Sequence, residues 1–160
     1  MMITPSANPD TQLFRFEADF VRTLRCIPMC VRFKLDRTGV KLSLRQWSRF
    51  TLEDRERLRL TPCAAATEVR AYGDLLLQLV QARSGETPAM LPNAVEVVWN
   101  ASTPPDAVVA LARARAVALP SDEAWSALSE LQRYAVVKLT RDAHENANFV
   151  PAMREFGLTL

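Results

Sequence analysis

Apolar residues recur every three or four positions through most of the chain, which is the spacing of one face of a helix. Two clear runs are Val69, Tyr72, Leu76 and Leu79, and Trp125, Leu128, Leu131, Ala135 and Leu139. A third run continues beyond a proline: Phe16, Phe20, Leu24, Ile27, Val31 and Leu35. Only AVEVVW at 94–99 has the composition of a strand, and it has no partner. The pattern predicts an all-α fold, a single compact domain of about six to eight helices with no significant sheet.

Glycines mark where several of these helices end. Gly39, Gly85 and Gly157 each stand where an apolar run stops, as is typical of helix C-termini. Gly73 lies inside a run instead, so we expect it at a close-packed position. Pro28 interrupts the run from Phe16 to Leu35, and a helix that starts near Pro28 and closes at Gly39 fits the pattern better than one kinked helix.

Hydroxyl and acidic residues mark where other helices begin. Thr61 and Thr103 each precede a proline, which predicts a capping residue followed by the first helical position. Ser121 is followed by two acids, and Thr51 with Asp54 resembles a capping box. From these boundaries we predict a flexible tail at 1–12 and one helical domain at 13–160. Its N-terminal half is 13–84, its linker 85–103 and its C-terminal half 104–160.

Charge is unevenly distributed along the 160 residues. The formal net charge is +2, but residues 22–59 hold eleven Arg or Lys and four Asp or Glu, a local net of +7. Such an excess suits an acidic partner, a nucleic acid or a phosphate-bearing ligand, although solvated helix faces are the commoner cause. The start of the chain lacks the pattern of a secretory signal, and no apolar run is long enough to span a bilayer. We therefore expect a cytoplasmic protein.

The stretch CIPMC places Cys26 and Cys30 on either side of Pro28. A structural zinc site needs four ligands, and the other soft ligands, Cys63 and His144, are isolated in the sequence. A thioredoxin-type motif needs two residues between its cysteines and a strand before them. Free cysteine is among the residue types most often buried, so we expect core packing, with Cys26 in a bend and Cys30 in a first helical turn.

The stretch KLTRDAHENANF at 138–149 contains the only histidine, His144. A metalloprotease helix needs a second histidine four residues later, where Asn148 stands. No serine has the glycine-flanked turn of a nucleophile. The segment fits a turn and helix cap, with Asn148 capping the helix that follows, or a polar surface for a partner. The carboxylate pairs Glu53/Asp54 and Asp122/Glu123 are expected at solvated helix starts. No catalytic residue, metal or cofactor is therefore assigned.

Two stretches together resemble a known family: FRFEADFVRTLRCIPMCVRFKLDRTGVKLSLRQW at 14–47 and LQRYAVVKLTRDAHENANFVPAMREFGL at 131–158. They are similar to the nitrate-reductase-associated proteins, small bacterial proteins encoded near nitrate reductase and molybdopterin-biosynthesis genes. The combination of RCIPM early and KLTR…HEN.NF late identifies the resemblance. The resemblance implies a context, the assembly or maturation of a cytoplasmic assimilatory nitrate reductase or the handling of its molybdenum cofactor, and it supplies no catalytic residues.

The resemblance and the missing catalytic residues together lead to the main hypothesis, a non-enzymatic accessory or maturation protein that binds nitrate reductase or its cofactor-insertion machinery. The candidate contact residues are Arg25, Arg32, Lys34, Arg133, Lys138, His144, Glu145, Asn146 and Asn148. Three alternatives stay open: a small-ligand or regulatory module with a pocket between the helical halves, a metalloprotein or enzyme, and a helix–turn–helix at 43–60. The metalloprotein would use Cys26, Cys30, Cys63 and His144. A role in nucleic-acid binding ranks last.

Overall fold

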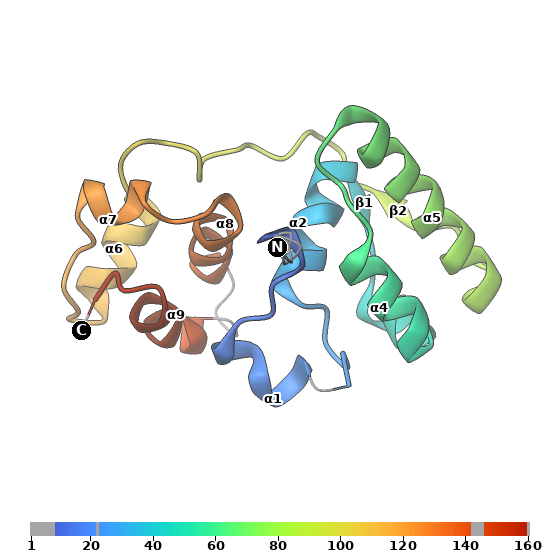
Figure 1. Ribbon diagram of the computed structural model, residues 1–160, viewed down its shortest axis with the longest axis horizontal. Coiled ribbons are helices and arrows are strands. Elements are labelled where there is room, and N and C mark those ends of the chain that lie inside the picture. Colours follow the sequence, from blue (N-terminus) through green and yellow to red (C-terminus); the bar gives the residue numbers. More distant parts are fainter. Residues whose placement is uncertain (1–8, 22, 142–145, 160) are drawn as a thin grey trace, which may run out of the picture. The chain divides into compact units, whose positions relative to one another are not determined.

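The computed structural model describes residues 9–21, 23–141 and 146–159. Their contacts divide into two compact units. The first contains the residues up to Leu13 together with Glu17–Val95, and the second contains Phe14–Phe16 together with Glu96–Leu160. Both units are built from helices, and the sheet in the described residues has two short strands (Figure 1). The all-α prediction is confirmed, whereas the predicted tail, linker and single domain stay predictions.

The first unit packs helix α2 against helices α4 and α5. Its elements are η1 (Pro9–Thr11), α1 (Ala18–Val21), α2 (Met29–Thr38), β1 (Val40–Lys41), α3 (Leu44–Ser48), α4 (Leu52–Leu60), α5 (Ala66–Ser84) and β2 (Ala89–Met90). Strands β1 and β2 are antiparallel, with Val40 opposite Met90. The interior is formed by Phe33, Trp47, Leu58, Leu76 and Val80. Burial of these large apolar side chains is the main force that holds the unit together.

The second unit packs helix α8 against helices α6 and α9. Its elements are α6 (Asp106–Ala114), α7 (Asp122–Ser126), α8 (Glu130–Leu139), η3 (Asn146–Asn148) and α9 (Phe149–Glu155), and most of η2 (Arg15–Glu17) joins them. Phe14 makes this early segment part of the unit: its ring stacks on Phe16 at 5.5 Å between centroids and meets Phe156 edge-on at 4.9 Å. Residues 14–16, at the start of the first family-like stretch, thus pack against Phe156, near the end of the second.

The predicted helix ends are confirmed at all three glycines. Gly39, Gly85 and Gly157 have φ of 73°, 68° and 72°. Residues with a Cβ adopt this left-handed conformation only at a cost in free energy, which glycine avoids. Gly39 and Gly85 are the C-caps of α2 and α5. The prediction for Gly73 was wrong, because a Cβ placed there would meet no atom within 4 Å.

The predicted helix starts are confirmed at Ser121 and at Thr51, where Asp54 completes a capping box. They are wrong at both Thr-Pro pairs. Thr61 ends α4, since its hydroxyl donates to the carbonyl of Arg57 at 2.6 Å. At the second pair, Pro104 is not the first helical residue, because the proline that follows it disfavours the helical conformation at position 104. Helix α6 therefore starts only after Pro105.

Two apolar runs do not form the continuous helices that their spacing predicts. The run from Trp125 to Leu139 is split at Ser129, whose capping box with Gln132 starts α8. The run that includes Leu24 ends in a turn, where Leu24 has a φ of 50°. Residues 94–99, which have the composition of a strand but no partner, form no strand, and the short strands of the described residues lie at 40–41 and 89–90.

Candidate functional site

The two thiols of CIPMC lie where the sequence predicts, at a bend and in the first turn of α2. Cys26 is half-buried, and Cys30 and Cys63 are buried. Loss of solvent raises the pKa of the Cys30 thiol to about 12 and that of Cys63 to about 11. A thiolate is the reactive and metal-binding form, so these environments favour core packing for Cys30 and Cys63. Within the described ranges no three His, Cys, Asp or Glu side chains gather to hold a metal ion.

Lys34 does not lie on a contact surface, and this prediction was wrong. Its side chain is fully buried, and its ammonium donates to the carbonyls of Arg59 at 2.6 Å and Thr61 at 2.8 Å. These carbonyls belong to the end of α4, where backbone acceptors have no helical partner. Lys34 is therefore a structural cation that joins α2 to the end of α4.

Several other cationic side chains of the basic segment 22–59 also form hydrogen bonds or ion pairs within the protein. Arg37 donates to the carbonyl of Cys63 at 3.0 Å, and Arg59 donates to that of Thr11 at 3.0 Å. Arg59 also pairs with Glu56 at 2.7 Å. Arg32, a candidate contact residue, is half-buried and interacts with neighbouring groups. Many of the cationic side chains behind the local net charge of +7 thus stabilise the first unit.

Arg25 is exposed and lies in a turn with a defined position. The carbonyl of Leu24 accepts a hydrogen bond from the Trp47 indole at 2.8 Å, and that of Thr23 accepts one from Arg55 at 3.2 Å. Arg25 itself makes no hydrogen bond or ion pair within the part of the chain that the structure describes. The same holds for the exposed side chains of Lys41, Arg49 and Arg57. These four cations are available to an acidic partner.

Arg133 and Lys138 lie on α8 and differ in their surroundings. The guanidinium of Arg133 donates to the carbonyls of Trp99 at 2.9 Å and Leu128 at 2.5 Å, and to the side chain of Asn100 at 3.3 Å. Arg133 therefore has a structural role, because it fixes residues 99–100 on the start of α8. Lys138 is half-buried, with its ammonium 6.0 Å from the centre of the Tyr134 ring.

The polar segment after α8 is described only in part. His144 and Glu145 lie outside the described residues, so their prediction as contact residues is untested. Asn146 and Asn148 are half-buried in η3. Asn148 occupies the N-cap position of α9, as predicted, but its side chain makes no capping hydrogen bond.

The carboxylate of Asp54 is buried, in contrast to the solvated position that its place at a helix start predicts. Its oxygens accept from Arg83 Nε at 2.7 Å and Arg83 Nη2 at 3.1 Å, so that α4 is joined to α5. One oxygen also accepts the backbone N–H of Thr51 at 3.0 Å. The hydrogen bond from Arg83 lowers the pKa of Asp54 below its ordinary value. Asp54 is thus kept ionised for structural reasons.

We expect Asp54→Asn to lower the free energy of unfolding by about 1–2 kcal/mol at neutral pH, since a partly exposed ion pair is lost. A carboxyl with a depressed pKa stabilises the fold above its unfolded pKa and loses this contribution as the pH falls through the folded one. The difference from wild type should therefore shrink below about pH 4. Urea denaturation across this range measures it. Glu53→Gln, at an exposed neighbour, is the control, and an equal loss in both variants would exclude the ion pair as the cause.

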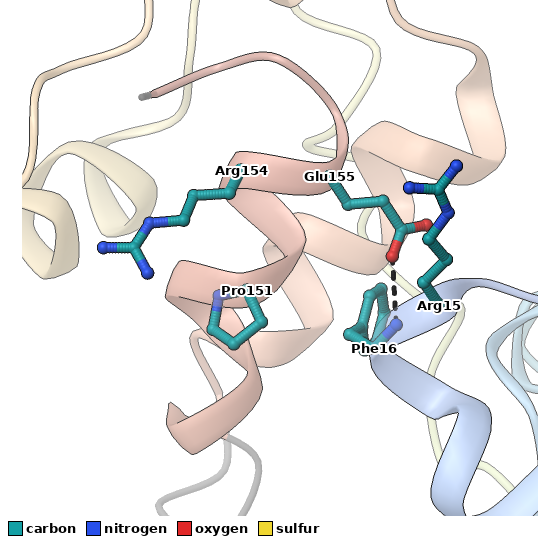
Figure 2. A pocket seen from close by; sticks show the side chains of 5 residues that line it. All are labelled: Arg15, Phe16, Pro151, Arg154 and Glu155. Atoms are coloured by element: carbon teal, nitrogen blue, oxygen red, sulfur yellow. Dashed lines mark hydrogen bonds between the residues drawn. The ribbon is translucent and has the colours of Figure 1, made fainter.

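A hollow of about 430 Å³ lies in the second unit, between η2 and α9. Figure 2 shows Phe16 and Pro151 between the side chains of Arg15 and Arg154, with Glu155 above Phe16. The carboxylate of Glu155 accepts the backbone N–H of Phe16 at 3.0 Å. None of these five residues was predicted as a site residue. The one signal for them in the sequence is that the two family-like stretches contain them.

A second hollow, of about 370 Å³, lies in the first unit along α5. It is lined by Leu77, Gln78, Gln81, Thr87 and Pro88, which carry no charge. Taken together, the described side chains offer surfaces for binding: exposed arginines in both units, and one hollow that combines arginine with an apolar floor. Within the described residues, no helix is long and apolar enough to cross a bilayer.

Comparison with known proteins shows a similarity to one protein family. The family described as conserved nitrate reductase-associated protein matches residues 13–156, which include most of both units. No curated protein matches the chain, and no solved structure matches it. The family match agrees with the resemblance seen in residues 14–47 and 131–158 and extends through the middle of the chain. The chain therefore belongs to the family of conserved nitrate reductase-associated proteins.

Proposed function

We propose that this protein is a non-enzymatic accessory factor that binds nitrate reductase, or a protein that inserts its molybdenum cofactor, and acts in the assembly of the reductase. The observation that supports the proposal most directly is the family match over residues 13–156. The match extends through both units, so the similarity to this family covers nearly the whole chain and not one short motif.

The chemistry of the described side chains supports binding as the mode of action. The thiols of Cys30 and Cys63 are buried and have raised pKa values, and the ammonium of Lys34 is held by backbone carbonyls. Groups held in this way stabilise the fold and do not face a substrate. Arg25, in contrast, is exposed on a turn fixed by two hydrogen bonds. A guanidinium pairs in bidentate fashion with carboxylates and phosphates, so it suits either an acidic protein surface or a pterin dinucleotide.

Affinity capture of the tagged protein from its own cells grown on nitrate tests this proposal. We expect nitrate reductase or a molybdenum-cofactor insertion protein among the captured proteins by mass spectrometry, and the tagged reductase should capture this protein in return. Arg25→Glu should weaken the capture several-fold, because an exposed ion pair becomes a repulsion. Arg70→Glu, at an exposed site on α5, is the matched control. Failure to capture either class of protein in both directions would contradict the proposal.

A further inference from the structure

The turn that precedes α2 and the end of α3 are held together by one guanidinium. Arg55 Nη1 donates to the carbonyl of Thr23 at 3.2 Å, and Arg55 Nη2 donates to that of Ser48 at 3.3 Å. The indole of Trp47 also donates to the carbonyl of Leu24 at 2.8 Å. The turn therefore lies against the end of α3 in a fixed position.

These hydrogen bonds bring three arginines to one part of the surface. Arg25 stands two positions after the first carbonyl that Arg55 holds, and Arg49 stands one position after the second. The side chains of Arg25 and Arg49 are exposed and make no hydrogen bond or ion pair within the described residues. Arg55 bonds to neutral carbonyls, so within those residues no carboxylate balances its charge. We call these three residues the arginine cluster.

The cluster differs from other arginines of the first unit, which face carboxylates. Arg59 pairs with Glu56 at 2.7 Å, and Arg83 pairs with Asp54 at 2.7 Å. Unbalanced like charges repel one another and destabilise the folded state. Arg55 Nε is in addition buried and has no hydrogen-bond partner in the part of the chain that the structure describes, which is also unfavourable. A negatively charged partner relieves the repulsion, so the cluster favours association.

An exposed apolar side chain and one carboxylate follow the cluster along the chain. Leu52 lies three positions before Arg55 on α4, which makes the two neighbours on the helix surface, and it is 54% exposed. Glu53 is exposed too, but residues two positions apart on a helix do not face each other, so Glu53 does not balance Arg55. The surface thus combines an excess of positive charge with an apolar contact.

We infer that the arginine cluster is a docking site for an acidic segment of the partner protein, in which carboxylates pair with Arg25 and Arg49 while an apolar side chain rests on Leu52. The inference rests on the proposed function and specifies the chemistry of the partner's surface. These three side chains are exposed, which suits a protein surface better than a small molecule, because a small molecule needs enclosure. A peptide can place its carboxylates opposite the arginines alone, whereas the evenly spaced phosphates of a nucleic acid would also meet Glu53.

Titration with an acidic peptide, followed by NMR through the backbone amide shifts, tests the inference directly. The probe is acetyl-Glu-Asp-Leu-Asp-Glu-amide at low salt, and acetyl-Gln-Asn-Leu-Asn-Gln-amide is the uncharged comparison. We expect the acidic probe alone to bind, with shifts concentrated around Arg25 and Arg49. Arg25→Glu/Arg49→Glu should weaken binding about 10-fold, because two exposed ion pairs become repulsions. Shifts spread evenly over the first unit would overturn the site.

The matched control is Arg57→Glu/Arg70→Glu, which reverses two exposed charges in the same unit. Arg57 follows Arg55 by two positions and so faces another way, and Arg70 lies on α5. The control should bind the probe within about 2-fold of the wild type. The replaced side chains of both double variants make no hydrogen bond or ion pair among the described residues, so both variants should unfold at the wild-type urea concentration. Equal weakening in both would show attraction by net charge alone and overturn the site.

Leu52→Ala tests the apolar contact, with Leu60→Ala as its control at a similarly exposed position of α4. We expect the first change to weaken probe binding about 2–3-fold and the second to leave it unchanged. A short oligothymidylate of equal charge should bind more weakly than the peptide. Equal binding of the two, or equal affinity in both leucine variants, would show a general anion surface and overturn the assignment to a protein segment.

The same variants separate this inference from the proposed function. If the wild type captures nitrate reductase and Arg25→Glu/Arg49→Glu does not, both stand. If both capture it equally, the proposed function stands and the docking site is overturned. If neither captures it but the acidic probe binds the wild type and not Arg25→Glu/Arg49→Glu, the cluster is a site for acidic segments and the proposed partner is wrong.

Discussion

Replacing Lys34 with methionine is expected to lower the free energy of unfolding by about 2–4 kcal/mol. The ammonium donates to the carbonyls of Arg59 and Thr61, and neither acceptor receives another hydrogen bond from the described residues. Methionine fills a similar volume, so the loss reflects the two carbonyls and not a cavity. Each buried acceptor left unsatisfied costs about 1–3 kcal/mol, offset in part because a charge no longer has to be buried.

The pH dependence of stability distinguishes this role from simple packing. Burial lowers the pKa of the Lys34 ammonium below its ordinary value of 10.5. Between the folded and the ordinary pKa the unfolded chain binds more protons, so the contribution of Lys34 to stability rises with pH in this alkaline range. The stability of Lys34→Met, relative to wild type, should therefore fall as the pH rises through that range.

Denaturation by urea at several pH values measures both effects, with Lys41→Met as the control. Lys41 is exposed on β1, so its replacement removes the same charge from the same unit without disturbing a buried hydrogen bond. We expect Lys41→Met to unfold at the wild-type urea concentration. Equal midpoints for all three proteins would mean that water satisfies the end of α4 when the ammonium is gone, and that Lys34 does not stabilise the fold.

Local signals in the sequence predicted α2 well and the neighbouring elements less well. Pro28 restricts the backbone at one end, and Gly39 adopts a left-handed conformation at the other, so both boundaries depend on nearby residues alone. Thr61 shows the limit of such signals. Its hydroxyl can serve the helix before it or the helix after it, and only the structure shows that it bonds to Arg57.

The roles of ionisable side chains were harder to predict, because they depend on residues distant in the sequence. Lys34 follows Cys30 by four positions and Val31 by three, so it shares their buried helix face, a signal that the basic composition of the segment concealed. The hollow offered no local pattern at all. The hydrogen bond between Phe16 and Glu155 joins residues 139 positions apart, and periodicity within one helix says nothing about such a pairing.

The second large effect is expected at Glu17, which caps the N-terminus of α2 from a distance. Pro28 occupies the N-cap position and has no side-chain acceptor, so a local cap is missing. The buried carboxylate of Glu17 supplies the acceptor and receives the backbone N–H of Met29 at 2.7 Å. A negative charge there also interacts favourably with the positive end of the helix dipole. Glu17 therefore joins the early segment of the first unit to α2.

Glu17→Ala should lower the free energy of unfolding by about 2–4 kcal/mol, because a buried N–H loses its acceptor and the removed side chain leaves a void. Glu17→Gln keeps an acceptor and loses only the charge, so its cost should be about 1 kcal/mol. Urea denaturation gives both values, with the exposed neighbour change Asp19→Asn as the control. Amide exchange gives a local reading: the N–H of Met29 should exchange faster in Glu17→Ala than in Glu17→Gln. If that amide stays equally protected in both variants, α2 has another cap, and the stability loss in Glu17→Ala comes from the void alone.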